Sequence, residues 1–185
     1  MPELIALAKA RPGKLNFGSG GVGSAAHLSG ELLKTMAKIQ MVHVPYKGMG
    51  LALSDLVGGH IDLMFPAILS GIPQYKAGRL RGLGVTSPRR HPSLPEIPTI
   101  AEAAVPGFET QSWFGILVPA GTPPEIINKI NAAFQQTVNR PEIKEALINQ
   151  GSNPETNSPE EFSQFIKNDV IRAARVFKAA GVNPE

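Results

Sequence analysis

The chain has 185 residues, which is enough for one domain or two small ones with a buried core. Its content of 42% hydrophobic and 18% charged residues excludes a disordered chain. The net charge of +3 is spread thinly, so we expect no nucleic-acid partner, and the absence of cysteine excludes disulfides, thiolate catalysis and cysteine-bound zinc.

The first half of the chain alternates helix-like and strand-like segments. In chain order we expect a helix over 2–10, a strand over 14–17, a helix over 24–37, a strand over 39–44, a helix over 50–57, a strand over 61–65, a helix over 67–77 and a strand over 80–86. Such alternation is typical of a parallel sheet in an α/β fold. Four prolines in 87–98 then predict an irregular surface loop, and Thr99 with Glu102 predicts a capping box that opens a short helix.

The last third of the chain is predicted to be almost wholly helical. A strand is expected over 111–118, helices over 122–139, 140–150 and 158–180, and a short strand near 152–156. Thr122 and Ser158 each begin a predicted capping box. One strand offers three helices little surface on which to bury their apolar faces. This region therefore either packs on the first domain or lacks part of its sheet. We place the domain boundary within 106–112.

Residues 18–24, here called the glycine loop, join a predicted strand to a predicted helix. Gly18, Gly20 and Gly23 match the spacing of the dinucleotide fingerprint, but the next strand lacks the acidic residue that would bind the ribose. A second interpretation is a turn that merely needs small residues. A third interpretation fits better, because a loop that enters a helix presents free N–H groups, and Ser19 and Ser24 add hydroxyl donors. The sequence therefore predicts an anion site for a carboxylate or a phosphate.

Candidate catalytic groups are few. The four histidines show no metal-ligand spacing, and no serine lies in a nucleophile-elbow motif. His27, one turn into the helix after the glycine loop, either bonds Glu31 or lends a proton or a charge to a bound anion. His43 alternates with apolar neighbours, as a core or edge residue would, and Asp62 either points into a cleft or forms a salt bridge at a sheet edge. We predict no catalytic residue, no metal site and no enzyme activity.

A series of short motifs follows one another along the chain. They are FGSGGVGSxxH over 17–27, HVPYKG over 43–48, DLVGGHID over 55–62, LPEIPTxxE over 94–102, WFGILVPAGTP over 113–123 and SPEEF over 158–162. In this combination and order they resemble the Bug family, the extracytoplasmic solute receptors of tripartite tricarboxylate transporters. The resemblance covers essentially the whole chain.

The resemblance implies an α/β fold like that of type II periplasmic binding proteins, with two lobes. Residues 1–108 would form the second, ligand-binding lobe nearly whole, and residues 109–185 the C-terminal part of the first lobe. The family's N-terminal segment, with its Pro-Pro-Gly-Gly-type loop, has no counterpart here, which implies an N-terminally truncated chain. We expect the incomplete lobe to weaken ligand binding and to favour self-association through its apolar face.

The same resemblance implies a receptor that captures a small carboxylate, either a dicarboxylate or a tricarboxylate, for the membrane components of a tripartite tricarboxylate transporter, without a cofactor. The implied ligand-binding residues are Ser19, Gly21, Val22, Gly23, Ser24, His27, Pro66 and Ala67. The family is periplasmic, but the chain as written begins with no signal peptide, which predicts a cytoplasmic protein if it is made in this form. Two alternatives stay open: a dinucleotide-dependent enzyme that uses the glycine loop, and a remnant that oligomerises without binding a ligand.

Overall fold

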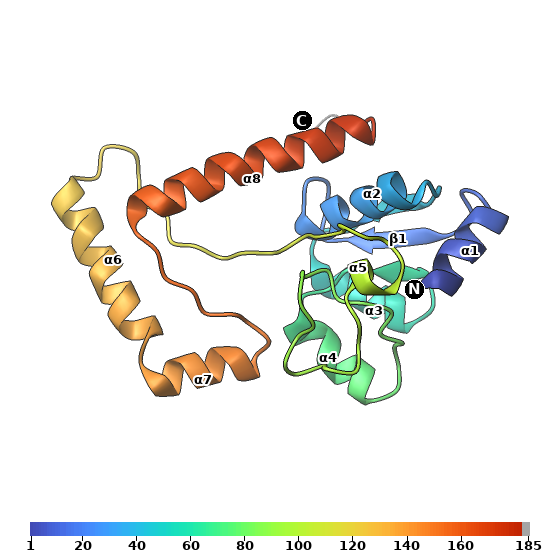
Figure 1. The fold of residues 1–185 in the computed structure, drawn as a ribbon, viewed down its shortest axis with the longest axis horizontal. Coiled ribbons are helices and arrows are strands. Elements are labelled where there is room, and N and C mark those ends of the chain that lie inside the picture. The colour runs from blue at the N-terminus through green and yellow to red at the C-terminus, as the bar shows by residue number, and fades with distance from the viewer. Residues whose placement is uncertain (183–185) are drawn as a thin grey trace. The chain divides into compact units, whose positions relative to one another are not determined.

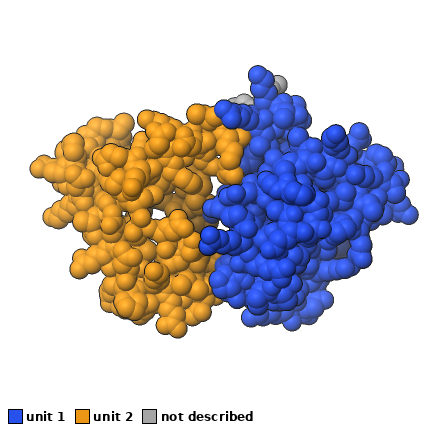
Figure 2. All heavy atoms as spheres, in the orientation of Figure 1, with its two compact units in different colours: residues 1–112, 173–185 blue, residues 113–172 orange. Residues whose placement is uncertain are grey.

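The computed structural model describes residues 1–182, and the chain divides into two compact units (Figure 1). Unit 1 comprises residues 1–112 together with 173–185, and unit 2 comprises residues 113–172 (Figure 2). Residues 173–182 thus belong to the first unit, and the assignment of the chain to two lobes of a receptor stays a prediction. None of the helices within residues 1–182 has the length and apolarity that a membrane span requires.

Unit 1 is built on a three-stranded parallel sheet in the order β2-β1-β3, which confirms the predicted parallel pairing. The strands are β1 (Asn16–Ser19), β2 (Val42–Pro45) and β3 (Leu63–Met64). The helices are α1 (Pro2–Ala10), α2 (Ala25–Ala37), α3 (Met49–Val57), α4 (Ile68–Lys76) and α5 (Ile100–Ala103). Each of α2, α3 and α4 follows one strand, so each helix begins at the edge of the sheet where its strand ends.

The core of unit 1 forms where α2 packs on the central strand. The most buried apolar side chains of this cluster, each at most 1% exposed, are those of Ala8, Phe17, Leu33, Ile100 and Phe108. Gly30 on α2 lies directly against the Phe17 ring, and a Cβ at that position would overlap the ring. A hydrogen bond of 2.7 Å joins the buried hydroxyls of Ser29 and Thr110, which ties the segment after α5 to the same helix.

The strand predicted over 80–86 is wrong. The segment forms a single parallel bridge between Val85 and Thr99 instead of a ladder. Gly82 and Gly84 allow isoleucine side chains from the neighbouring segment to lie against the backbone. Glycine has no side chain to pack in a strand and loses more conformational freedom on folding than other residues. The apolar pattern alone therefore predicted a strand that does not form.

Unit 2 consists of helices and connecting segments. The helices are α6 (Pro124–Val138), α7 (Pro141–Asn149) and the first part of α8 (Pro159–Ala179). The strands predicted over 111–118 and 152–156 are wrong, and residues 113–172 contain no strand. A strand needs a neighbouring strand to satisfy its backbone N–H and C=O groups, and this unit supplies none.

Aromatic side chains connect the start of unit 2 to α8. The Trp113 ring meets the rings of Phe162 and Phe165 edge to face, each at 5.5 Å between centroids, and its Nε1–H donates to Asp169 at 3.0 Å. Val138 is the one buried apolar side chain within residues 113–172. Large apolar side chains that are more than half exposed in this unit are those of Phe114, Ile116, Leu117, Val170 and Ile171. Self-association through this surface stays a prediction.

Two of the three predicted capping boxes are confirmed. Thr99 and Ser158 each accept the N–H of a glutamate three residues later, and each glutamate side chain accepts the N–H of the cap. The box at Thr122 is wrong, because α6 begins one residue later with Pro123 as its N-cap. A residue before proline disfavours the helical conformation, so the proline at position 124 keeps Pro123 extended and outside the helix.

Candidate functional site

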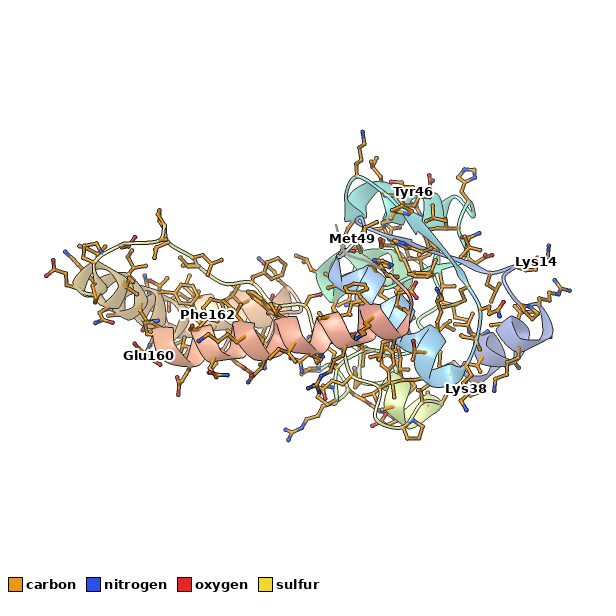
Figure 3. The ribbon with its side chains drawn as sticks, turned by 90° about the horizontal axis from the view of Figure 1, so that it is seen from above. Lys14, Lys38, Tyr46, Met49, Glu160 and Phe162 are labelled. Carbon is orange, nitrogen blue, oxygen red and sulfur yellow. The ribbon has the colours of Figure 1, made fainter. Side chains whose placement is uncertain are left out.

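Three helix N-termini meet at one edge of the sheet in unit 1. Because β1, β2 and β3 are parallel, their carboxyl ends lie at the same edge, where α2, α3 and α4 begin. Figure 3 shows Tyr46 and Met49, in the β2–α3 connection and at the start of α3, close together and at the opposite end of the unit from Lys14. In open α/β sheets, ligands bind outside the carboxyl ends of the strands. This edge is therefore the candidate site.

The glycine loop leaves β1 and enters α2 through two backbone conformations that favour glycine. Gly21 and Gly23 have φ angles of +128° and +81°. Ser24 is the N-cap of α2: its Oγ accepts the His27 N–H at 3.3 Å, and its own N–H donates to the Gly21 carbonyl at 3.2 Å. Local hydrogen bonds therefore fix the shape of the loop before any ligand is present.

The amides that the glycine loop and the first turn of α2 offer to an anion are those of Val22, Ala25 and Ala26. Within residues 1–182 none of these three N–H groups has a hydrogen-bond partner, whereas the N–H groups of Gly21 and Gly23 donate to side chains beneath the loop. Val22 is 59% exposed, so its surroundings are open to solvent. The positive end of the α2 dipole reinforces the free N–H groups, and the arrangement can hold a carboxylate or phosphate oxygen.

The start of α3 belongs to the same edge, and the sequence analysis did not include it in the site. Gly48 is the N-cap of α3, and no side chain caps this helix. A Cβ on Gly20 would lie 3.1 Å from the Met49 side chain and 3.3 Å from the Met49 amide nitrogen, so glycine at position 20 lets the start of α3 lie close to the glycine loop. The Tyr46 N–H donates to the Ser19 carbonyl at 3.0 Å and holds the connection beside the glycine loop. The available signal was a Pro-Tyr-Lys-Gly stretch between a strand and a helix.

Pro66 and Ala67 bring the third helix N-terminus to this edge. Ala67 is the N-cap of α4, again without a side-chain cap, and its carbonyl accepts the N–H groups of Ser70 and Gly71 at 3.0 Å. The pairing of β1 with β3 places the connection after β3 next to the glycine loop. Pro66 and Ala67 therefore lie on the edge where ligand contacts were predicted for them, and the contacts themselves stay predictions.

Two of the predicted site residues, Ser19 and His27, lie beneath the glycine loop. Their exposed fractions are 0% and 2%. Ser19 Oγ lies 2.6 Å from His43 Nε2 and accepts the Gly21 N–H at 3.1 Å, while His27 Nδ1 accepts the Gly23 N–H at 3.1 Å. The structure gives both side chains partners inside the unit, and direct contact with a ligand stays a prediction for each.

His27 also approaches a buried carboxylate. Its Nε2 lies 3.7 Å from Glu31 Oε1, and that oxygen accepts a hydrogen bond of 2.8 Å from Lys34. This distance is longer than a hydrogen bond, so the predicted bond between His27 and Glu31 is not formed, and the contact with an anion stays a prediction. Burial lowers the pKa of His27, and it outweighs the raising effect of the Glu31 charge. The ring is therefore neutral at neutral pH.

Asp62 takes neither of the two roles considered for it. Its Oδ2 accepts the Asn16 N–H at 2.8 Å, and its own N–H donates to Asn16 Oδ1 at 3.0 Å. Asn16 begins β1, so this reciprocal pair lies at the amino edge of the sheet, opposite to the candidate site. The carboxylate joins the segments that enter β1 and β3 by satisfying a backbone donor at the start of a strand.

We expect acid to destabilise the fold through His43. Burial, assisted by the nearby His27 and Lys34, lowers the pKa of His43 from 6.5 to about 4. The unfolded chain therefore takes up a proton near pH 6.5 that the folded chain does not bind until about pH 4. The neutral ring contributes its full stabilising effect above the unfolded pKa of 6.5, and this effect is lost as the pH falls toward the folded pKa of about 4. Urea denaturation across this range measures the loss.

His43→Gln is the control for this pH dependence, since glutamine keeps a polar group near Ser19 Oγ but does not titrate. We expect the free energy of unfolding of the variant to change less between the two pH values than that of the unchanged protein. Equal pH dependence in the two proteins would contradict the role assigned to His43.

The alternative of a dinucleotide-dependent enzyme finds little support at this edge. β2 runs over Val42–Pro45 and carries no carboxylate to bind a ribose. Ser19 and His43 have the spacing of a nucleophile and its base, but the fully buried hydroxyl is not accessible to a substrate. Within residues 1–182, no group of three His, Asp or Glu side chains is placed to hold a metal ion.

Known proteins resemble this chain over nearly its whole length. The family described as tripartite tricarboxylate transporter family receptor matches residues 1–182. A UPF0065 protein in the tcbD-tcbE intergenic region of a Pseudomonas species is 42% identical over 171 residues, and protein BugT of Bordetella pertussis is 38% identical over 186 residues. Among solved structures, R. palustris Rpa4515 with adipate has a TM-score of 0.94 at 37% identity, and MatC from Rhodopseudomonas palustris with bound malate has a TM-score of 0.86 at 30% identity.

The similar proteins are longer than this chain. The matches cover 92% and 98% of the chain but only 51% and 56% of the two relatives. The two structures match 100% and 95% of the chain, which spans 62% and 61% of them. The chain thus spans between half and two thirds of the length of these proteins. The structural likeness, which includes a periplasmic binding protein named BugD at a TM-score of 0.87, confirms the predicted fold class.

Proposed function

Since this chain belongs to the tripartite tricarboxylate transporter receptor family, we propose that it captures a small dicarboxylate at the carboxyl edge of the sheet in unit 1. The observation that carries the proposal is the meeting of three helix N-termini there, with free amides at Val22, Ala25 and Ala26. Backbone N–H groups and the positive ends of helices bind carboxylates without help from a cationic side chain.

Two observations support a dicarboxylate with an aliphatic chain. Val22 in the glycine loop and Leu51 in the first turn of α3 are 59% and 58% exposed, and they offer apolar surface to methylene groups. The similar solved structures include one with adipate and one with bound malate, and both compounds are dicarboxylates. A tricarboxylate is the alternative within the same proposal.

The proposed contacts come from three segments. They are residues 21–24 of the glycine loop, the start of α3 at Met49, and the pair Pro66–Ala67 before α4. Ser19 and His27 support the loop from beneath. We further propose that the protein acts in the periplasm, delivers its ligand to the membrane components of a tripartite transporter and does not convert it chemically.

Calorimetric and thermal-shift titrations of the chain with adipate, malate, citrate and NADH test this proposal. We expect adipate or malate to bind and to stabilise the fold, because a ligand present at about 100 times its dissociation constant adds about 2.7 kcal/mol to the free energy of unfolding. Dimethyl adipate is the matched control, since it keeps the carbon chain and loses both charges. We expect no effect from the diester or from NADH.

Other outcomes would overturn parts of the proposal. Stabilisation by NADH alone would favour the dinucleotide-dependent enzyme. Stabilisation by citrate but not by the dicarboxylates would replace the ligand class with a tricarboxylate. Equal binding of adipate and its diester would show that the free amides do not hold a carboxylate.

A further inference from the structure

The glycine loop rests on a pair of stacked imidazole rings. The centroids of the His27 and His43 rings lie 3.8 Å apart with 7° between their planes. His27 comes from α2 and is 2% exposed, and His43 comes from β2 and contacts the buried Ser19 hydroxyl at 2.6 Å. One ring thus comes from a helix and the other from the sheet, and each contacts the glycine loop through a nitrogen atom.

The hydrogen bonds fix the protonation state of His27. The Gly23 N–H is a donor, so the Nδ1 atom that accepts it at 3.1 Å carries no proton. The hydrogen of the neutral ring then lies on Nε2, the atom that faces Glu31 at 3.7 Å. Protonation of Nδ1 would remove its lone pair and break the bond to Gly23.

The surroundings of His27 oppose a second proton. The titratable and charged groups that face it are Glu31 and Lys34 from α2 and His43 from β2, while its contacts from β1 and α8 are the aromatic rings of Phe17 and Phe177. Lys34 already pairs with Glu31, and a positive charge on one stacked ring would disfavour a positive charge on the other. Protonation of either ring therefore requires an acidic solution.

We propose that neutral His27 is the positioning residue of the glycine loop: its unprotonated Nδ1 holds the Gly23 amide, and a proton on that atom releases the loop and weakens carboxylate binding. The inference rests on the proposed function, because it assigns the carboxylate to this loop. It gives His27 a task that differs from the predicted contact with the ligand.

The two roles of His27 predict opposite effects of pH. A histidine that touched the anion would bind it more tightly when charged, so affinity would rise as the pH falls. A histidine that holds the loop through a lone pair must stay neutral, so affinity falls under the same change. The direction of the pH effect therefore separates a ligand contact from a positioning role.

Two variants separate the lone pair from the shape of the ring. His27→Asn places an amide oxygen close to the position of Nδ1 and does not titrate, while His27→Phe keeps a stacked ring and loses the acceptor. At about pH 7.5, we expect the dissociation constant for adipate or malate to rise about tenfold or more in the Phe variant and to change only a few-fold in the Asn variant. Circular dichroism is the check that both variants fold.

The pH profile is the second readout. Between about pH 7.5 and pH 5, we expect the affinity of the unchanged protein to fall by more than that of His27→Asn. Protonation of the ligand itself is common to both proteins, so its effect cancels in the ratio of their dissociation constants. Tighter binding by the unchanged protein at the lower pH, or a Phe variant that binds like the unchanged protein, would overturn the inference.

A ligand-free measurement distinguishes this inference from the proposed function. If no carboxylate binds the unchanged protein, the proposed function fails. NMR of the free protein then tests the positioning role alone, through the Nε2–H tautomer of His27 and the hydrogen exchange of the Gly23 amide. We expect faster exchange of that amide in His27→Phe than in His27→Asn, and equal exchange in the two variants would overturn the inference.

Discussion

Replacing Gly30 with alanine is expected to lower the free energy of unfolding by about 1–3 kcal/mol, the usual range for an overpacked core. Gly30 lies in α2, where its missing side chain lets the helix backbone rest on the Phe17 ring. A methyl group there would overlap the ring, which is itself 0% exposed and cannot move into open space. Urea denaturation followed by circular dichroism measures the change, with the slope of the transition expected to stay constant.

Gly50→Ala is the matched control, because Gly50 also lies in a helix and a Cβ there would meet nothing within 4 Å. Alanine is a better helix former than glycine, so the free energy of unfolding of this variant is expected to rise by about 0.5–1 kcal/mol. The two substitutions are chemically identical and have opposite expected signs. A stabilised Gly30→Ala would show that α2 and the central strand are less closely packed than the structure indicates.

The order of helices and strands in unit 1 could be predicted because it depends on local sequence features. Apolar periodicity, helix caps and the glycines that end helices indicate the elements that surround the sheet. The bounds of the strands could not be read in the same way. β1 continues through Gly18 and Ser19, which pair with Val44 and Pro45 of β2, although glycine and serine after a short polar strand are typical of a loop. Pairing with neighbouring strands decided the end of β1.

The glycine loop was predictable for the same reason, and its support was not. The spacing of the glycines and the helix that follows are local features. The stacked pair depends on the register of β1 with β2, which places Phe17 opposite His43, and on the packing of α2 over the sheet. His27 and His43 are 16 positions apart, and no local pattern joins them. The sequence interpretation therefore treated each histidine alone.

Unit 2 shows where an apolar pattern misleads. The run of apolar residues after Trp113 has the composition of a buried strand, yet Phe114 is 92% exposed and the segment has no strand beside it. Backbone pairing is a property of two segments, and one sequence segment cannot reveal whether its partner is present. The helices of this unit were predicted because their hydrogen bonds are internal to each segment.

Replacing Gly23 with valine is expected to abolish carboxylate binding while the chain stays folded. Gly23 has a φ of +81°, and a β-branched residue rarely adopts this conformation, which costs an L-residue about 1–2 kcal/mol. A Cβ at this position would meet nothing within 4 Å, so the effect is conformational and not a clash. The loop relieves the strain by changing shape, which moves the Val22 amide and breaks the bond from Gly23 to His27. Calorimetric titration with adipate and malate measures the loss.

Gly59→Val separates the loss of a site from the loss of stability. Gly59 has a φ of +75°, its Cβ would also meet nothing within 4 Å, and it lies in the turn that leads toward β3 at the amino edge of the sheet. The two variants therefore carry the same strain, and we expect similar decreases in the free energy of unfolding. Only Gly23→Val should lose the ligand, because only that glycine shapes the anion-binding edge. If both variants bind equally, Gly23 serves the fold alone, and the carboxylate must be held by the amides at the starts of α3 and α4.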